Sequence, residues 1–301
     1  MAWLATCLVL AASGCHHRDE GEGLVVTSST CIRCQPAVVV GALQSKEMDE
    51  TSGIASSSTG DGVYFAHNDS GDVARFFAID EQGARLAAFT FSPAPVVDCE
   101  DIARGPCDAG GASCLYVADI GDNTRQRGSI TIYRVKEPLT IADATVSSDR
   151  LALRYPDGAH DAETLLVHPR TGVLTIVTKE KAGGASTVYE APMPLTPGVL
   201  VTLLPVGTLR SPAGSPRFTG GSVHPEARGI LLRTYTHVFF APMRPEQTVA
   251  EALRAPLCSL PIAHEDQGEA IAWLRAGKGF LTVGEGIGAS VNLTRCEGPG
   301  P

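Results

Sequence analysis

The sequence lacks an excess of positive charge and, beyond its first residues, any long apolar run. Lys and Arg number 24 against 33 Asp and Glu, which gives a formal net charge of −9. Such a balance argues against nucleic acid or an anionic membrane surface as a partner. No segment after the N-terminal stretch is long and apolar enough to cross a bilayer. Contact with a membrane is therefore expected only through a lipid anchor.

Local signatures of common enzymes are also missing. The sequence contains no Gly-x-Ser-x-Gly elbow, no His-Glu-x-x-His pair and no P-loop, so no classical hydrolase signal supports an enzyme. The stretch Gly284-Glu285-Gly286-Ile287-Gly288 resembles a dinucleotide loop, but no strand-helix-strand pattern surrounds it. Short β-rich runs separated by Gly, Asp and Ser turns dominate instead of helical patterns. The sequence therefore predicts an all-β protein.

The N-terminus reads as an export signal. Residues 1–14 form an apolar stretch too short to span a bilayer, and small residues lead into Cys15 in a way that resembles a bacterial lipobox. We predict a lipoprotein signal peptide over 1–14, lipidation at Cys15 and a flexible tether over 15–36. The protein is then expected in the bacterial cell envelope, on the outer membrane or its periplasmic or extracellular face. An apolar N-terminus without lipidation is the alternative.

The remaining cysteines fit an oxidising compartment. There are seven of them: Cys31, Cys34, Cys99, Cys107, Cys114, Cys258 and Cys296. Cys107 and Cys114 flank a loop between two predicted strands, so we predict a disulfide that closes this hairpin. The odd number leaves one thiol unpaired. Cys31 and Cys34 are open to three interpretations, a redox pair, half of a zinc site, or a structural link near the closure of the fold that involves Cys296, and we favour the last.

A unit recurs along the chain. Each copy opens with a hydroxyl or carboxylate residue beside small apolar ones, and the openings are Ser52-Gly53-Ile54-Ala55, Glu100-Asp101-Ile102-Ala103, Glu163-Thr164-Leu165-Leu166, Thr219-Gly220-Gly221-Ser222 and Glu269-Ala270-Ile271-Ala272. Repeats of roughly 50 to 60 residues built from short strands are typical of β-propellers. We therefore predict one propeller domain over 37–301 with five blades.

The last unit shows how the ring is expected to close. It reaches the end of the chain without a fourth strand, whereas the β-rich run Ala37–Leu43 precedes the first blade and has no assigned place. Pairing this N-terminal run with the last blade completes that blade and removes two exposed strand edges. A six-bladed ring would need one more unit, for which the chain has no room.

The equivalent strand starts of a propeller converge on one axis. Three carboxylates and two hydroxyls are expected to meet there: Ser52, Glu100, Glu163, Thr219 and Glu269. An all-oxygen cage of this kind suits a hard divalent cation, and we predict Ca²⁺. Solvated glutamates at strand starts are the plain alternative, but three at equivalent repeat positions are hard to assign to chance.

Polar residues at the second-strand ends are expected on the same face, because the second strand runs back antiparallel to the first. Candidates for positioning water are Asp69, Asp119 and Asp122, and candidates for binding an anion are His67, Lys179, Lys181 and Arg233. Such a rim suits a phosphate or carboxylate that bridges the metal and the cations. Solvated loop residues around a structural ion are the alternative.

The succession Ser52, Glu100, Glu163, Thr219 and Glu269, with openings such as Glu50-Thr51-Ser52-Gly53-Ile54, resembles the soluble calcium-activated nucleotidase, or apyrase, family. The resemblance implies a five-bladed propeller with one central calcium whose ligands come one from each blade. It differs at His67-Asn68, where the family carries an acidic pair, and Asp69 is displaced by one.

Two functions follow as expectations. The first is calcium-assisted hydrolysis of nucleotides or other phosphate esters on the metal-bearing face. The second is a non-catalytic propeller that binds a small anionic ligand or a protein partner around a purely structural ion. A monomer is expected in both cases, and a propeller alone does not decide between them.

Overall fold

The computed structural model describes residue 1 and residues 31–108, 110–180, 184–213 and 217–297. These residues form 21 strands and one four-residue helix, α1 (Val249–Ala252), so the predicted all-β class is confirmed. In the described part of the chain, no helix is long and apolar enough to cross a membrane. The predicted signal peptide and Cys15 lie outside the described residues.

Antiparallel pairing of consecutive strands organises the fold. One sheet has the order β1 (Val38–Ala42), β21 (Ser290–Arg295), β20 (Gly279–Gly284) and β19 (Gly268–Trp273). A second consists of β10 (Ala162–Val167), β11 (Leu174–Thr178), β12 (Ser186–Glu190) and β14 (Leu204–Leu209). A third consists of β15 (Phe218–Val223), β16 (Gly229–Thr234), β17 (Val238–Pro242) and β18 (Cys258–Leu260).

The largest sheet contains nine strands and joins two antiparallel groups. The first group is β2 (Thr51–Ser56), β3 (Val63–Asn68), β4 (Arg75–Asp80) and β5 (Arg85–Ser92). The second is β6 (Cys99–Pro106), β7 (Ser113–Asp119), β8 (Ile130–Lys136) and β9 (Ala144–Arg154), with β13 (Val201–Thr202) beside β9. The first residues of β9, from Ala144, pair in parallel with β5 and so join the two groups.

Turn chemistry fixes the hairpins. In the turn from β4 to β5, the Asp80 carboxylate accepts hydrogen bonds from the backbone N–H groups of Gln82 and Ala84, each at 2.9 Å. Gly83 adopts a φ of 85°, which favours glycine. A Cβ on Gly83 would also collide with the Ala42 carbonyl, so this turn packs closely against the end of β1.

Hydrophobic side chains fill the spaces between successive groups of strands. Five buried clusters are found among the described residues. Phe65 and Phe76 of the first group pack with Leu115 of the second, and Ile54 of the first packs with Leu281 near the end of the chain. Each fully buried side chain of this size contributes roughly 1.5 to 3 kcal/mol. The core is therefore a ring of interfaces.

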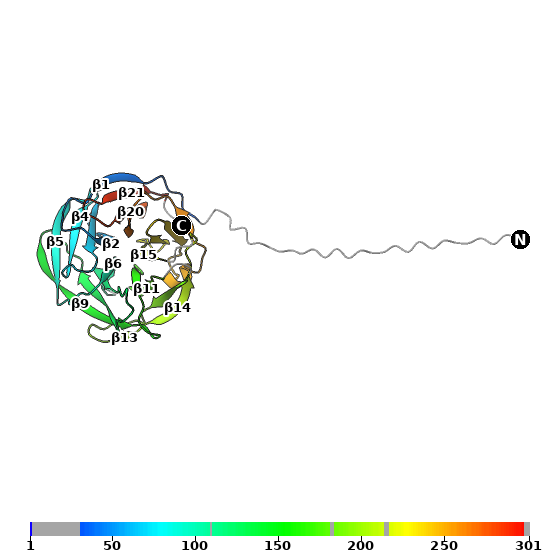
Figure 1. The fold of residues 1–301 in the computed structure, drawn as a ribbon, viewed down its shortest axis with the longest axis horizontal. Coiled ribbons are helices and arrows are strands. Elements are labelled where there is room, and N and C mark those ends of the chain that lie inside the picture. Colours follow the sequence, from blue (N-terminus) through cyan, green and yellow to red (C-terminus); the bar gives the residue numbers. More distant parts are fainter. Residues whose placement is uncertain (2–30, 109, 181–183, 214–216, 298–301) are drawn as a thin grey trace.

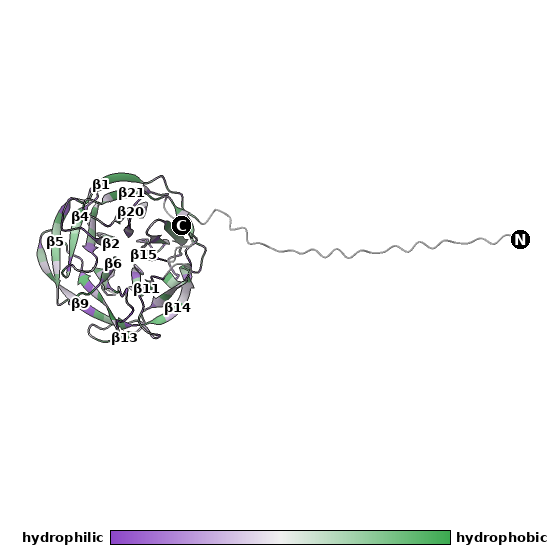
Figure 2. Ribbon diagram, viewed as in Figure 1, coloured by the Kyte–Doolittle hydropathy of each residue, from purple (hydrophilic) through white to green (hydrophobic). Residues whose placement is uncertain are grey.

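The inner strands surround a common centre. They are in contact in the order β2, β6, β10, β15, β19 and back to β2. Figure 1 shows β2, β6 and β15 toward the middle of the disc, and β5, β9 and β14 at its periphery. Figure 2 shows hydrophobic residues along much of the sheets and hydrophilic segments near the centre beside β2 and β15. This arrangement brings the starts of the inner strands together.

Strand pairing and disulfides join the two ends of the described chain. The N-terminal strand β1 pairs antiparallel with β21, with Val38 opposite Leu293, as predicted. Disulfides link Cys34 with Cys296 and Cys31 with Cys258, so the structural interpretation of the first two cysteines is confirmed and the redox and zinc interpretations are wrong.

The third disulfide links Cys107 with Cys114, as predicted. Cys99 is the free cysteine of the described residues and is buried. Three disulfides suggest an oxidising environment outside the cytoplasm.

Candidate metal centre

Each predicted cage residue occupies the same place in its inner strand. All are buried, and they lie at the second position of their strands: Ser52 in β2, Glu100 in β6, Glu163 in β10, Thr219 in β15 and Glu269 in β19. At each of these positions the register shifts, and the residue has no partner in the neighbouring strand. Such β-bulges turn a side chain away from the regular ladder and are frequent beside functional sites.

The three bulge glutamates and further carboxylates gather at this end of the inner strands. Carboxylate oxygens of Asp69, Glu269 and Glu285 lie within 4.8 Å of one another, and so do those of Asp69, Asp98 and Glu100. Asp69 belongs to both groups. We call these six side chains, Glu163 included, the carboxylate ring. Mutual proximity of so many carboxylates is unfavourable unless a cation or a proton offsets it.

The electrostatics of the carboxylate ring reflect this crowding. Burial and then the neighbouring Glu163 carboxylate raise the pKa of Glu100 well above its ordinary value. Burial and the same neighbour raise the pKa of Glu269. Burial and Asp69 likewise raise the pKa of Asp98. The ring therefore holds negative charge poorly without a cation.

One ammonium group reaches the carboxylate ring. Lys179 Nζ forms an ion pair with Glu163 Oε1 and lies 5.3 Å from the centre of the Tyr235 ring. Burial lowers the pKa of Lys179, but the charge and hydrogen bond of Glu163 and the neighbouring Tyr235 together outweigh it, so that the pKa is raised. The second oxygens of Glu163 and Glu269 are buried and have no hydrogen-bond partner among the described residues. Two buried acceptors thus remain unsatisfied at the centre of the ring.

The two hydroxyl residues of the predicted cage make hydrogen bonds between inner strands. The Ser52 hydroxyl donates to the Glu100 carbonyl oxygen at 2.7 Å, and the Thr219 hydroxyl donates to the Gly268 carbonyl oxygen at 2.9 Å. Each bond joins an inner strand to the next one around the centre. Their part as cation ligands stays a prediction.

The three aspartates predicted to position water have different surroundings. Asp69 is part of the carboxylate ring and is half-buried. Asp119 is buried and forms an ion pair with Arg127 at 2.8 Å. Asp122 is buried and accepts the Arg127 backbone N–H at 2.7 Å. Only Asp69 is among the three-carboxylate groups, whereas Asp119 and Asp122 hold the segment that follows β7.

The predicted anion-binding residues are not brought together as expected. Arg233 is fully buried, and its guanidinium donates to Glu265 at 2.8 Å and to the Ala270 carbonyl at 2.8 Å. His67 is buried as well, and its Nδ1 donates to the Asn68 carbonyl oxygen. Lys181 lies outside the described residues. Of this set, Lys179 is the one placed at the carboxylate ring, where it pairs with Glu163.

Two carboxylates of the ring and one neighbouring glycine were not predicted from the sequence. Asp98 precedes β6 and lies outside the repeated opening, so no repeat position marks it. Glu285 directly follows β20, which places it among the polar second-strand ends without singling it out. Gly121 is a third omission: a Cβ there would collide with the carboxylates of Glu100 and Asp98. Glycine therefore leaves the space that these two carboxylates occupy.

Comparisons with known proteins address the fold. No known protein family and no curated protein matches this sequence. Among solved structures, the chain is similar to the PQQ-bound form of aldose sugar dehydrogenase from Streptomyces coelicolor. The TM-score is 0.50 at 12% sequence identity, and the match covers 89% of this chain and 99% of that chain. This likeness supports a β-propeller-like fold and, at such identity, carries nothing about activity or cofactor.

Proposed function

We propose that this chain is an exported five-bladed β-propeller that binds a divalent cation, calcium, at the carboxylate ring, and that the surrounding face binds a small anionic ligand or a protein partner. The observation that carries the proposal is the pair of buried, unpartnered oxygens of Glu163 and Glu269 within the ring. Five antiparallel groups of strands around one centre support the blade count.

The donor set fits the ion. Calcium takes six to eight oxygen ligands, mostly from carboxylates, carbonyls and water. Glu100, Glu163 and Glu269 come from bulges of three inner strands, and Asp69 adds a carboxylate from the end of β3. Gly121 keeps open the space beside Glu100. A bound divalent cation would offset the repulsion that raises the pKa values of these carboxyl groups.

The side chains of this face have separate tasks in the proposal. The three glutamates and Asp69 would hold the ion, while Lys179 neutralises part of the Glu163 charge. When bound, the ion would supply open coordination positions for ligand oxygens. Asp119 and Asp122, together with Arg127, keep the connecting segment in place beside Asp98.

A phosphohydrolase acting on nucleotides or other phosphate esters is the second candidate. It is favoured by Asp69, a half-buried carboxylate that belongs to both three-carboxylate groups and could orient water beside a bound ion. Because Arg233 is committed to Glu265, Lys179 remains, of the predicted cations that the structure describes, to offset phosphate charge. We therefore place the ligand-binding propeller first.

The test measures the melting temperature of the purified chain at increasing calcium concentrations. The wild type is compared with Glu100→Gln and with the control variant Glu246→Gln. Glu246 is exposed and paired with exposed Arg244, so it serves as a matched control. At one hundred times the dissociation constant, calcium is expected to add about 2.7 kcal/mol, which raises the melting temperature of a domain of this length by roughly 5 °C. Glu100→Gln should abolish this increase.

A calcium response that survives Glu100→Gln, or that is absent from the wild type, would contradict the proposed site. The same samples are then incubated with nucleoside di- and triphosphates. Calcium-dependent phosphate release that is lost in Glu100→Gln would show that the protein is a hydrolase and not only a binding protein.

A further inference from the structure

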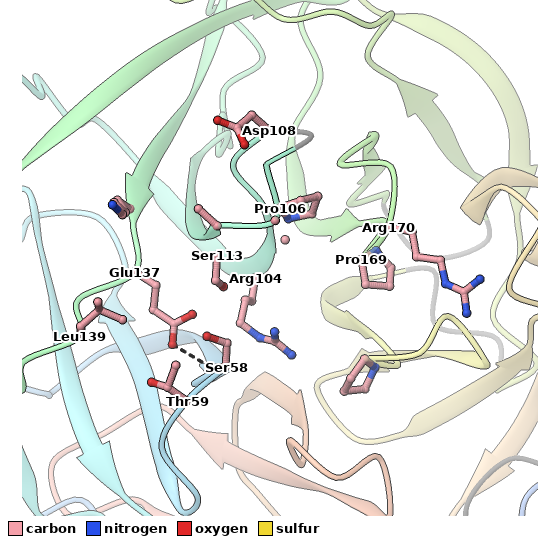
Figure 3. A pocket seen from close by; sticks show the side chains of 15 residues that line it. Ser58, Thr59, Arg104, Pro106, Asp108, Ser113, Glu137, Leu139, Pro169 and Arg170 are labelled. Atoms are coloured by element: carbon pink, nitrogen blue, oxygen red, sulfur yellow. Dashed lines mark hydrogen bonds between the residues drawn. The ribbon is translucent and has the colours of Figure 1, made fainter.

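A cavity lies at the opposite end of the inner strands from the carboxylate ring. It has a volume of about 530 Å³, and its polar lining includes Ser58, Arg104, Ser113, Lys136, Glu137 and Arg170. Arg104 follows Glu100 by four residues on β6, which separates them by about 13 Å along the strand. Figure 3 shows Arg104, Glu137 and Ser58 near one another, with Pro169 and Arg170 across the cavity. We call this space the basal cavity.

Arg104 is half-buried and lacks the partner that a guanidinium in such a place normally has. Among the described residues it has no ion pair, and its Nε is buried without a hydrogen-bond partner. Burial lowers the pKa of Arg104; the Glu137 carboxylate opposes this effect, and the nearby Arg275 adds to it. Arg275 is itself paired with Asp61. Burying a charge without a directly paired or hydrogen-bonded partner is costly, so the side chain is placed for an anion from outside the chain.

Two further buried polar atoms without partners lie beside Arg104. A narrow space that shares Arg104 with the basal cavity is lined by Trp273, and Trp273 Nε1 is a buried donor without an acceptor. Glu137 lines the basal cavity, and its Oε1 accepts the Ser57 hydroxyl at 2.8 Å and the Ser58 N–H at 2.7 Å. Its Oε2 is buried and unpartnered. The Arg104 guanidinium and Trp273 Nε1 can therefore donate hydrogen bonds to a ligand, and Glu137 Oε2 can accept one.

We propose that the basal cavity binds a small organic oxyanion that also carries a hydroxyl group. The carboxylate or phosphate oxygens bind the planar fork of Arg104, which suits bidentate oxyanions. A hydroxyl of the ligand donates to Glu137 Oε2. Lys136 and Arg170 are exposed at the cavity and add positive charge. The volume of about 530 Å³ lies within the usual range for small-molecule sites.

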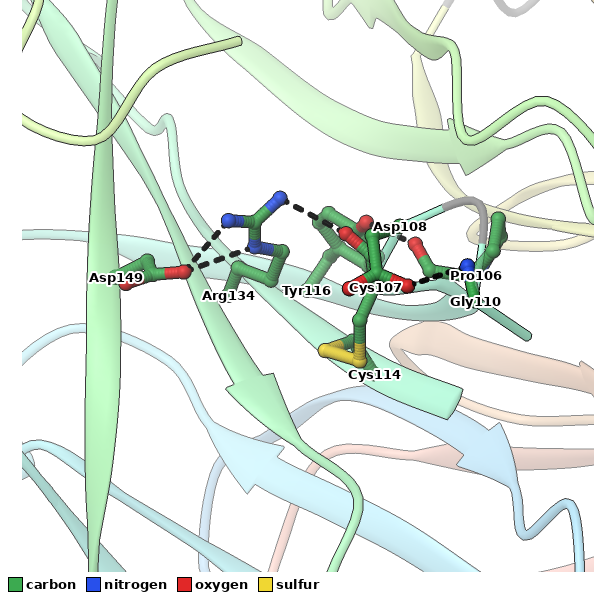
Figure 4. The surroundings of a disulfide bond; sticks show 8 residues. All are labelled: Pro106, Cys107, Asp108, Gly110, Cys114, Tyr116, Arg134 and Asp149. Carbon is green, nitrogen blue, oxygen red and sulfur yellow. Dashed lines mark hydrogen bonds and ion pairs between the residues drawn. A yellow bond between two sulfur atoms is a disulfide. The ribbon is translucent and has the colours of Figure 1, made fainter. Parts of the chain in front are cut away.

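One wall of the basal cavity is held in place before any ligand binds. The hairpin closed by Cys107 and Cys114 contributes Asp108 and Ser113 to the lining. Figure 4 shows Arg134 bridging from Asp149 to this hairpin, and Arg134 donates to the Cys107 carbonyl at 3.0 Å and to Asp149 at 2.6 Å. A preformed wall reduces the ordering cost of binding.

Tryptophan fluorescence can report on this site directly. The chain has two tryptophans, Trp3 and Trp273, so the full chain carrying Trp3→Phe leaves only the indole beside Arg104. This protein is titrated with glucose 6-phosphate, glucuronate and uncharged glucose, with EDTA present so that calcium plays no part. We expect a saturable change in emission with a charged sugar and none with glucose. The tighter of the two charged sugars identifies phosphate or carboxylate as the preferred group.

Two variants decide whether Arg104 holds the anion. Arg104→Gln is expected to weaken binding at least tenfold, whereas Arg150→Gln, which alters an exposed arginine of β9, should change it less than twofold. If Arg104→Gln does not unfold cooperatively, Arg104→Lys replaces it and should also weaken binding at least tenfold. Unchanged affinity in the folded Arg104 variant, an equal response to glucose, or no saturable response to either anion would overturn the proposal.

Discussion

The two ends of the inner strands carry opposite chemistry on the same strands. On β6, Glu100 joins the carboxylate ring and Arg104 lines the basal cavity; on β19, Glu269 and Trp273 lie in the same relation. The glutamates occupy bulges and have no cross-strand partner, whereas Arg104 is paired regularly with Leu115. The bulge turns one side chain of each inner strand toward the shared centre, and the regular ladder beyond it restores ordinary packing.

The comparison also separates two electrostatic situations. The carboxylate ring has surplus negative charge and one paired ammonium, Lys179. The basal cavity has an unpaired guanidinium, Arg104, near a carboxylate with a free oxygen, Glu137. Replacement of the cation should therefore have opposite consequences at the two ends. At the ring, replacement of Lys179 removes the ion pair that neutralises Glu163. At the cavity, replacement of Arg104 removes a charge that has no ion pair among the described residues.

The largest expected effect is that of Lys179→Met in the calcium-free chain. Removing one member of a buried ion pair leaves Glu163 uncompensated among other carboxylates, which should cost about 3 kcal/mol. Urea unfolding in EDTA measures this loss, and added calcium should restore more stability to the variant than to the wild type. Lys136→Met, at the exposed side of the basal cavity, is the control. A variant as stable as the wild type in EDTA would show that the ring does not depend on a cation.

A smaller effect is expected from Gly121→Ala, which adds no charge. The new methyl group would displace the carboxylates of Glu100 and Asp98, and we expect calcium affinity to fall about tenfold, or about 1.4 kcal/mol. Gly128→Ala is a matched control, because a Cβ at Gly128 meets no atom within 4 Å. Calorimetric titration with calcium compares the two. Equal affinities would place the ion away from Glu100.

The smallest effect is expected from Arg104→Met in the absence of anions. Replacing an unpaired, half-buried guanidinium with an apolar side chain should raise the free energy of unfolding by about 1 kcal/mol or less. Urea unfolding of this variant and of Arg150→Met, which should equal the wild type, provides the measurement. A marked loss of stability in Arg104→Met would mean that Arg104 already has a stabilising partner, and the distinction between the two ends would fail.

Repetition explains what the sequence could predict. Glu100, Glu163 and Glu269 open equivalent units, and equivalent positions in a ring converge, so their common burial at one end follows from the pattern. The pairing of the N-terminal strand with the last one followed from a missing fourth strand in the last unit. The hairpin disulfide followed from two cysteines that flank one loop.

What the sequence could not predict depends on connections and on side-chain direction. Asp98 reaches the ring from a connection whose course no repeat fixes. Arg233 was expected on the rim, but Glu265, in the connection before β19, draws its guanidinium into the interior. No feature of the sequence marks Arg104 as part of a binding site, because an arginine near a strand end usually faces water. Its burial depends on turns from several groups of strands that meet only in the folded chain.

The linkage at the start of the described chain has a mechanical consequence. Cys31 is bonded to Cys258 and Cys34 to Cys296, just before β1. A pull applied through the preceding N-terminal residues therefore enters the protein at a covalent junction with its C-terminal part. The load bypasses the hydrogen bonds between β1 and β21, which would otherwise open one after another. A propeller held by its N-terminus is thus gripped at two covalent points and resists being unwound from that end until the disulfides are reduced.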